Sequence, residues 1–169
     1  MNFDRISHLL SDLAFRQAIS LFPCAFSLLV LEEWRQFASW AMRYASHHFT
    51  RHDYITIHVA GIITAFLSAS LIQVLPYRWL VWVFFAFVFA PAGFFNALSH
   101  AGATSVYRVY CHGLLRALTV YPPMYYYLSR LAYREGLLSG RGGLWALAVA
   151  GVFHAAEVSH NVFKAWKAW

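Results

Sequence analysis

The chain has 169 residues, of which 60% are apolar, 19% are aromatic and only 12% are charged. Soluble domains are about 25% charged, and a chain of this size cannot hide so much apolar surface inside one core. The composition therefore excludes a cytosolic globule and a disordered chain, and two cysteines are too few for a disulfide-stapled secreted module. The net charge of +6 reflects a shortage of acidic residues, so we expect no nucleic-acid partner.

Five apolar runs are long enough for a helix that crosses the roughly 30 Å of hydrocarbon in a membrane. In chain order they cover residues 14–31, 55–75, 79–101, 109–131 and 144–163. We expect an all-α fold, a polytopic membrane helix bundle of about five transmembrane helices that forms a single domain over residues 1–169. Such a chain is an integral, multi-pass protein of a bacterial inner membrane or an endomembrane. Its first partners are membrane lipids, and the sequence leaves its oligomeric state open.

The segments between these runs predict the connections. Residues 32–54 place apolar side chains at helical spacing among arginines and histidines, which is typical of an amphipathic helix at the membrane interface. Residues 1–12 show a shorter version of the same pattern. Turns are predicted at residues 76–78, 102–105 and 134–143. Pro91 and the Pro122-Pro123 pair lie inside apolar runs, where they should kink helices.

A few polar side chains interrupt the apolar runs, although a charge at the centre of a membrane helix costs roughly 2.5 to 3.5 kcal/mol. They are Glu32, Glu33, His58, Asn96, His100, His112, Arg116, His154, Glu157 and His160. We name the N-terminal side of the membrane side A and the opposite side side B. The polar residues come late in the first, third and fifth runs and early in the second and fourth, so all fall in the half nearest side B. The sequence therefore predicts one shared polar site in that half.

These residue types suit a metal site. Carboxylate and imidazole groups are ligands of zinc and iron, and Glu157 with His160 has the Glu-x-x-His spacing that di-iron helix bundles use. We expect a bound transition metal, zinc or iron, whose ligands are Glu32, His100, Glu157 and His160. Glu33 or Glu157 then acts as the acid or base.

A metal-free site is the alternative. Two neighbouring carboxyls in apolar surroundings cannot both ionise easily, so one keeps its proton and acts as acid while the other acts as base. His100 or His160 then relays the proton, and Arg116 binds an anionic group or intermediate. The predicted catalytic residues are Glu32, Glu33, Asn96, His100, His112, Arg116 and Glu157.

Single residues also have simpler interpretations. A lone histidine on an apolar helix is more often a hydrogen-bonded core residue than a ligand, which applies to His58, His112 and His154. Glu33 can equally mark the end of a span and pair with a nearby arginine. Cys24 and Cys111 have no partner at ligand spacing, and we expect both to be packed thiols.

Three motifs follow one another along the first 130 residues. They are Leu29-Val30-Leu31-Glu32-Glu33-Trp34, Asn96-Ala97-Leu98-Ser99-His100, and a stretch from Val106 to Leu118 that contains Tyr110-Cys111-His112-Gly113. Together they resemble the HXXEE family of small integral membrane proteins, which has a histidine three residues before its paired glutamates. The resemblance implies a membrane site built from acidic and histidine residues, and it implies no reaction type.

Two positions depart from that family's pattern. Leu29 stands where the first histidine of the motif would be, and Tyr110-Cys111-His112-Gly113 takes the place of a Tyr-Ser-Pro-Gly-like turn. We hypothesise that His112 supplies the imidazole that is missing at position 29.

The sequence thus predicts a metal-dependent integral membrane enzyme that acts on a lipophilic small molecule entering from the bilayer. A metal-free acid/base isomerase or cyclase of the same architecture is one alternative. A small transporter or lipid-binding membrane protein is another, because it can use the same polar cluster as a binding or proton site. The last alternative is a lipid-exposed subunit of a larger assembly. The almost entirely apolar half near side A favours a one-sided pocket over a transport path.

Overall fold

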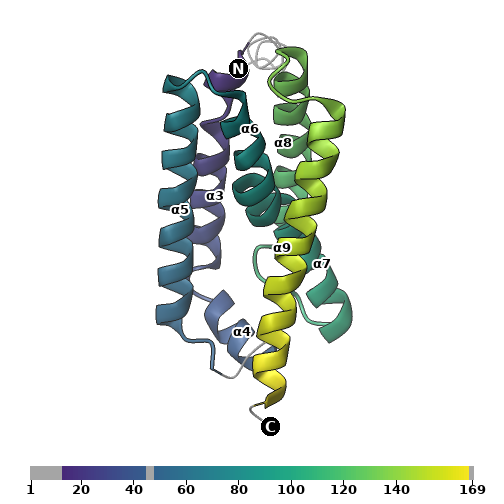
Figure 1. Cartoon of the computed structure of the whole chain (residues 1–169). Coiled ribbons are helices and arrows are strands. Elements are labelled where there is room, and N and C mark those ends of the chain that lie inside the picture. Colours follow the sequence, from purple (N-terminus) through teal and green to yellow (C-terminus); the bar gives the residue numbers. More distant parts are fainter. Residues whose placement is uncertain (1–12, 45–47, 168–169) are drawn as a thin grey trace.

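The computed structural model describes residues 13–44 and 48–167, with side chains except at positions 157 and 160–167. The described chain is helical and contains no strand, which confirms the predicted all-α fold. Its elements are α2 (Phe15–Ala18), α3 (Leu21–Glu33), α4 (Phe37–Tyr44), α5 (Arg51–Val74), α6 (Arg78–Phe84), η1 (Phe85–Phe95), α7 (Asn96–Tyr107), α8 (Leu114–Arg134) and α9 (Gly140–Lys167). The long helices run up and down the molecule, with α4 lying across one end (Figure 1).

Three helical stretches within the described residues are long and apolar enough to cross a membrane. They are Phe15–Glu33, Arg51–Val74 and Arg78–Tyr107, and they coincide with the first three predicted spans. Helices α8 and α9 form over the fourth and fifth, and α9 packs chiefly against η1. The structure therefore supports a membrane helix bundle, while the number of five spans stays a prediction.

Helix α8 is less apolar than the first three stretches because it has two different faces. Its buried positions are Ala117, Tyr121, Leu128, Leu131 and Ala132, which recur at helical spacing. Tyr126, Arg130 and Tyr133 are exposed on the other face. The Pro122-Pro123 pair lies inside this helix, which nevertheless continues over 21 residues.

The predicted break at residues 102–105 is wrong. Helix α7 continues to Tyr107, and within it the hydroxyl of Ser105 donates to the carbonyl of Ala101, so this hydroxyl is accommodated without a break. The chain turns instead between Arg108 (φ 53°) and Gly113 (φ 90°), two residues in the left-handed region. Consequently α8 begins at Leu114, and His112 lies in the turn before this helix instead of in its first turns.

Pro91 has a visible effect on the third span. A proline inside a helix has no N–H to donate, and its ring clashes with the carbonyl four residues earlier. Around Pro91 the helix widens into the π-helix η1, in which the N–H of Asn96 reaches the carbonyl of Pro91, five residues back. This wide segment directly precedes α7, the helix that carries His100.

The predicted interfacial helix over residues 32–54 is much shorter in the structure. Helix α4 covers only Phe37–Tyr44, and α5 already begins at Arg51. The N-terminus of α5 is closed by a capping box: the N–H of Asp53 donates to the hydroxyl of Thr50, and the N–H of Thr50 donates to Asp53 Oδ2. The shorter helix predicted at residues 1–12 lies outside the described residues.

Buried aromatic rings fill the middle of the bundle. Phe22 of α3 lies 4.6 Å from Phe89 of η1 and makes an edge contact with Phe84 at 5.6 Å, both between ring centroids. Tyr121 of α8 packs on the same ring of Phe22. We name the end of the bundle where α3 and α7 finish and where α5 and α8 begin the B end. The aromatic core occupies the middle of the bundle, and the buried polar groups lie at the B end.

Candidate functional site

Glu33 is the centre of the polar cluster at the B end. It is the last residue of α3, and only 1% of its surface is exposed. The hydroxyl of Tyr54, from the first turn of α5, lies 3.0 Å from the carbonyl of Val30 and 3.4 Å from Glu33 Oε2. Tyr54 therefore ties the end of α3 to the start of α5 and orients the carboxyl group.

Two imidazoles face this carboxyl from different helices. His100 Nε2, on α7, lies 3.3 Å from Glu33 Oε1, and His58 Nε2, on α5, lies 3.9 Å from Glu33 Oε2. His58 stacks on the Tyr54 ring, and its Nδ1 donates to the Tyr54 carbonyl at 2.8 Å. In a neutral His58 ring the proton then sits on Nδ1, so Nε2 is an acceptor directed at the carboxyl.

A thiol meets the other side of the His100 ring. Cys111 Sγ lies 3.1 Å from His100 Nδ1, and both residues are buried, at 2% and 3% exposure. The backbone of Cys111 is fixed at both ends, because its N–H donates to Thr104 Oγ1 and its carbonyl accepts from the N–H of Leu114. Burial and the nearby Glu33 carboxyl raise the pKa of the Cys111 thiol to about 12, so the thiol is protonated at neutral pH.

Gly113 makes room for the carboxyl. A Cβ atom built on Gly113 would overlap with Glu33 Oε1 and would lie 2.8 Å from Glu33 Cδ. The same glycine adopts φ 90°, which disfavours any side chain. The turn between α7 and α8 therefore approaches Glu33 with its bare backbone, and this close approach brings Cys111 to the cluster.

Helix α4 covers the cluster from the end of the bundle. The Phe37 ring lies 5.6 Å from the His100 ring between centroids. Trp40 and Ala41 form a small buried apolar cluster with Cys111. The site is thus closed by aromatic side chains in this structure.

Glu32, Arg116 and Asn96 do not join the centre of the cluster. Glu32 lies about 100° around α3 from Glu33. Its side chain is 35% exposed and pairs with Arg116 Nε at 2.7 Å, while Arg116 Nη1 donates to the carbonyl of Leu28. This contact is a surface ion pair, and such pairs contribute about 0 to 1 kcal/mol. Asn96 is half-buried one turn before His100 on α7.

The structure shows no direct contact between the His112 imidazole and Glu33, so the hypothesis that His112 replaces the imidazole missing at position 29 stays without direct support. The imidazoles that face Glu33 are His58 and His100. His112 lies in the turn with its ring 5.8 Å from that of Tyr110, and its buried Nδ1 has no hydrogen-bond partner among the described residues. Leu29 itself is part of the buried apolar core.

The predicted metal ligands lie in two regions. Glu157 and His160 belong to the last turns of α9, and their side chains lie outside the described part of the structure. One turn earlier, His154 Nε2 lies 2.6 Å from Ser99 Oγ and links α9 to α7. Among the described side chains, no group of three or more His, Cys, Asp or Glu residues is arranged to hold a metal ion. The zinc or iron site therefore stays a prediction.

Four residues of the cluster are not among the predicted catalytic or metal-binding residues: Tyr54, His58, Cys111 and Gly113. Of these, His58 is predicted only as one of the polar residues in the apolar runs. Cys111 was expected to be a packed thiol, which its burial matches, but its contact with His100 was not foreseen. The expectation for Cys24 is wrong, because this thiol is exposed on α3. Tyr54 and Gly113 have no sequence signal of their own beyond the glycine that ends the Tyr110-Cys111-His112-Gly113 motif.

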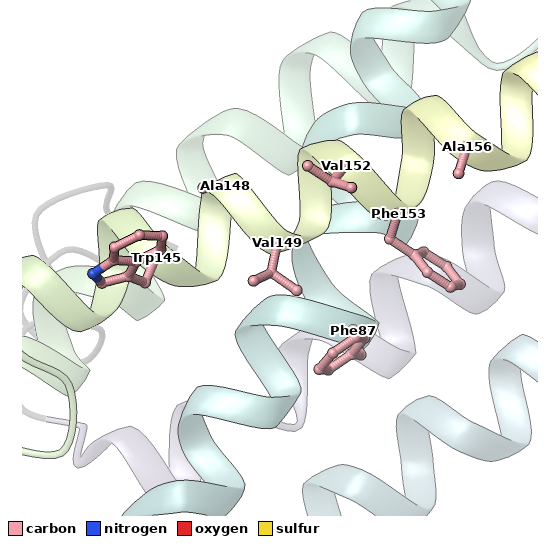
Figure 2. A pocket seen from close by; sticks show the side chains of 7 residues that line it. All are labelled: Phe87, Trp145, Ala148, Val149, Val152, Phe153 and Ala156. Atoms are coloured by element: carbon pink, nitrogen blue, oxygen red, sulfur yellow. The ribbon is translucent and has the colours of Figure 1, made fainter.

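A groove of about 460 Å³ lies away from this cluster, between η1 and α9. Figure 2 shows Phe87 on one side and a row of α9 side chains on the other, among them Trp145, Val149 and Phe153. The groove is open and lined by apolar side chains, which suits contact with lipid chains.

Comparison of the chain with known protein families, with curated proteins and with solved structures found no match. The resemblance to the HXXEE family therefore stays a prediction from three short motifs. What the B end can do must be inferred from its own geometry.

Proposed function

We propose that the protein is an integral membrane enzyme that acts on a lipophilic small molecule by acid/base chemistry at Glu33 and His100. The observation that carries the proposal is a single buried contact. Glu33 Oε1 lies 3.3 Å from His100 Nε2 and has no hydrogen-bond partner among the described residues, since the distance suits a hydrogen bond but the alignment does not. A buried polar atom left unpaired costs about 1 to 3 kcal/mol, and such atoms occur at functional sites.

A carboxyl and an imidazole in contact share one transferable proton. Either partner can hold it, so the pair can serve as acid toward one atom of a substrate and as base toward another. Glu33 is held by Tyr54 and the His100 ring is held by Cys111, so the two groups are kept close to each other before a substrate arrives.

His58 offers a way for protons to reach the outside. Its side chain is 18% exposed while that of Glu33 is 1% exposed, and the two groups are 3.9 Å apart. A proton released at Glu33 can pass to the acceptor Nε2 of His58, which lies nearer the protein surface.

The surroundings of the site favour a lipophilic substrate. Phe37, Trp40 and Tyr54 form its walls, and the helices that carry it expose many apolar side chains to the membrane. A molecule that already dissolves in the bilayer can approach such walls without losing a hydration shell.

The most direct test compares the conversion of natural lipophilic compounds by the wild-type protein and by variants of the site. Purified protein in lipid nanodiscs is incubated with a membrane lipid extract, and the products are compared by mass spectrometry. We expect at least one lipophilic compound to change with wild-type protein and to change at least 100-fold more slowly with Glu33→Gln or His100→Gln. Glu135→Gln is the matched control, because Glu135 lies at the other end of the bundle, where its oxygen accepts from the N–H of Phe15 and an amide oxygen can do the same. Equal turnover by the wild type and Glu33→Gln would disprove the proposal.

The metal-dependent version makes a different prediction. It requires Glu157 and His160 to bring α9 to the site, together with Glu32 and His100. Elemental analysis of the purified protein then gives about one zinc or iron per chain, and Glu157→Gln removes it. A metal content well below one per chain, in the isolated and in the reconstituted protein, leaves the metal-free mechanism in place.

A further inference from the structure

The thiol of Cys111 is a nucleophile that acid/base chemistry at Glu33 and His100 leaves unused. The two nitrogens of one imidazole contact two different groups: Nδ1 lies 3.1 Å from Cys111 Sγ, and Nε2 lies 3.3 Å from Glu33 Oε1. This order, with a nucleophile, a base and an acid that orients the base, is the arrangement of covalent acyl-transfer sites on many unrelated folds.

The backbone around Cys111 suits the charge that develops in acyl transfer. Cys111 lies three residues before Leu114, where the 21-residue helix α8 begins. The N-terminus of a helix carries partial positive charge, which stabilises a nearby oxyanion. In α8 the N–H groups of Leu114 and Leu115 already contact the Cys111 carbonyl and the Tyr110 hydroxyl, so the helix acts here through its dipole. The turn itself is fixed by the hydrogen bonds of Cys111 to Thr104 and Leu114.

Unpaired polar atoms around the thiol indicate that a polar group of a ligand belongs there. Five buried side-chain atoms have no hydrogen-bond partner in the described part of the chain, and three of them belong to residues near the thiol: Glu33 Oε1, His112 Nδ1 and Trp40 Nε1. Glu33 contacts His100, the base that faces the thiol. His112 is the residue after Cys111, and Trp40 packs in the same buried cluster as Cys111. The indole N–H of Trp40 is a donor without an acceptor, as a site for an ester carbonyl requires.

The surface of the B end suits a long chain on an anionic carrier. Four leucines of α3 and α8 are exposed beside the ion pair of Glu32 with Arg116: Leu28, Leu31, Leu115 and Leu118. Exposed guanidinium groups surround the same end, namely Arg35, Arg43, Arg51, Arg108 and Arg116. Leucines receive an acyl chain, and arginines bind phosphate groups with paired hydrogen bonds.

We propose that Cys111, His100 and Glu33 form a Cys–His–Glu site that accepts the long-chain acyl group of an anionic carrier, a phospholipid or an acyl-coenzyme A. The inference rests on the proposed function, because it uses the same acid/base pair and names its substrate class. Helix α4 covers the thiol, so its side chains Trp40 and Ala41 have to move when the acyl donor enters.

The reaction has two balanced halves. Cys111 Sγ attacks the carbonyl carbon while its proton passes to His100 Nδ1; the intermediate then collapses, the bond to the leaving alcohol or thiol breaks, and His100 returns the proton to that leaving group. The product of this half is a thioester on Cys111. In the second half water or a lipid alcohol, deprotonated by His100, attacks the thioester, and the acyl group leaves as the free acid or a new ester with the thiol restored.

The test follows the thioester directly. Full-length protein in nanodiscs receives a terminal-alkyne acyl chain in one of two forms, 17-octadecynoyl-coenzyme A or phosphatidylglycerol that carries the same chain. After coupling to a dye, the labelled residue is identified by mass spectrometry, and neutral hydroxylamine cleaves thioesters selectively. We expect a hydroxylamine-sensitive label on Cys111 in at least one arm, and the arm that labels identifies the carrier.

Variants separate this chemistry from spontaneous acylation. We expect the rate of labelling to be unchanged in Cys24→Ser, lost in Cys111→Ala, and at least tenfold lower in His100→Gln and Glu33→Gln. Cys111→Ser keeps a nucleophile, so its label should become resistant to hydroxylamine. Thermal unfolding of each variant shows whether it folds.

Three outcomes overturn the inference: a label confined to Cys24, a label on Cys111 that does not depend on His100, and no label in either arm. If the lipid extract still changes in a manner that depends on Glu33, only the acyl-transfer inference fails. If the extract does not change either, the proposed function fails with it.

Discussion

Glu32 and Glu33 are neighbours in the sequence but have opposite surroundings in the fold. Their side chains point about 100° apart on the helix; Glu32 reaches an exposed arginine, while Glu33 is enclosed by Tyr54, His100 and Gly113. The sequence shows that only one of the two can point at the centre of a site. Which one does so depends on the turn between α7 and α8, which leaves room for a carboxyl only at Gly113.

Gly113→Ala should therefore disrupt the site. The new methyl group would overlap with Glu33 Oε1 at a backbone position of φ 90°, so overlap adds to backbone strain. Each of these two effects costs about 1 to 3 kcal/mol. We expect a clear fall in the midpoint of thermal unfolding in detergent, together with loss of any activity that depends on Glu33.

Gly136→Ala is the matched control. Gly136 also has a positive φ, 65°, but nothing lies within 4 Å of its missing Cβ. This variant carries the strain without the overlap and should lose about 1 kcal/mol. Equal losses in the two variants would contradict the close packing of Gly113 on Glu33.

The thiol of Cys111 should react slowly in the folded protein. The thiolate is the reactive form, and the pKa of Cys111 is raised to about 12. Its thiol therefore stays protonated at every pH below that value, and α4 covers it in addition. We expect N-ethylmaleimide at pH 8 to modify Cys111 at least 100-fold more slowly in the folded protein than in protein unfolded with denaturant, as followed by peptide mass spectrometry. Equal rates in the folded and the unfolded protein would show that the turn is not packed as described.

At the scale of single elements, the start of α5 matters because it carries both Tyr54 and His58. The hydroxyl of Thr50 accepts from the N–H of Asp53, so Thr50→Ala removes the cap. We expect a loss of about 1 kcal/mol in the free energy of unfolding. Ser68→Ala is the control, since the Ser68 hydroxyl donates to the Thr64 carbonyl of its own helix and caps no helix end. A cap variant as stable as this control would contradict the proposed role of Thr50.

The elements were predictable where apolar length or proline chemistry decides the outcome. The first three spans and the turn before Arg78 follow from hydropathy and Pro76, and Pro91 predicted a distortion where η1 lies. The break between α7 and α8 is predicted too early, because glycine, serine and threonine can lie inside a helix when their hydroxyl groups find hydrogen-bond partners. No sequence signal marked Arg108 as the residue with a left-handed backbone.

At the scale of the whole molecule, the polar side chains of four different elements meet at one end. The order of polar and apolar residues along the predicted spans is enough to place Glu33, His58 and His100 at the same depth. It cannot show which groups touch, because the contact of Cys111 with His100 joins a turn to a helix and depends on tertiary packing. Glu32 illustrates the same limit. The sequence predicts a site role for Glu32 as well as for Glu33, but in the structure Glu32 pairs with Arg116 outside the cluster.

The central claim is that Glu33, His100 and Cys111 form one buried cluster, in which one nitrogen of His100 faces Glu33 and the other faces Cys111. Nitrogen-15 NMR of histidine-labelled protein in nanodiscs, with His100→Gln to assign the signals, tests it without knowledge of a substrate. We predict that the His100 signals shift in Glu33→Gln and in Cys111→Ala, each chiefly at the nitrogen that faces the altered group, and stay unchanged in Glu32→Gln. His100 signals that respond to Glu32→Gln as strongly as to Glu33→Gln, or to neither, would contradict the account.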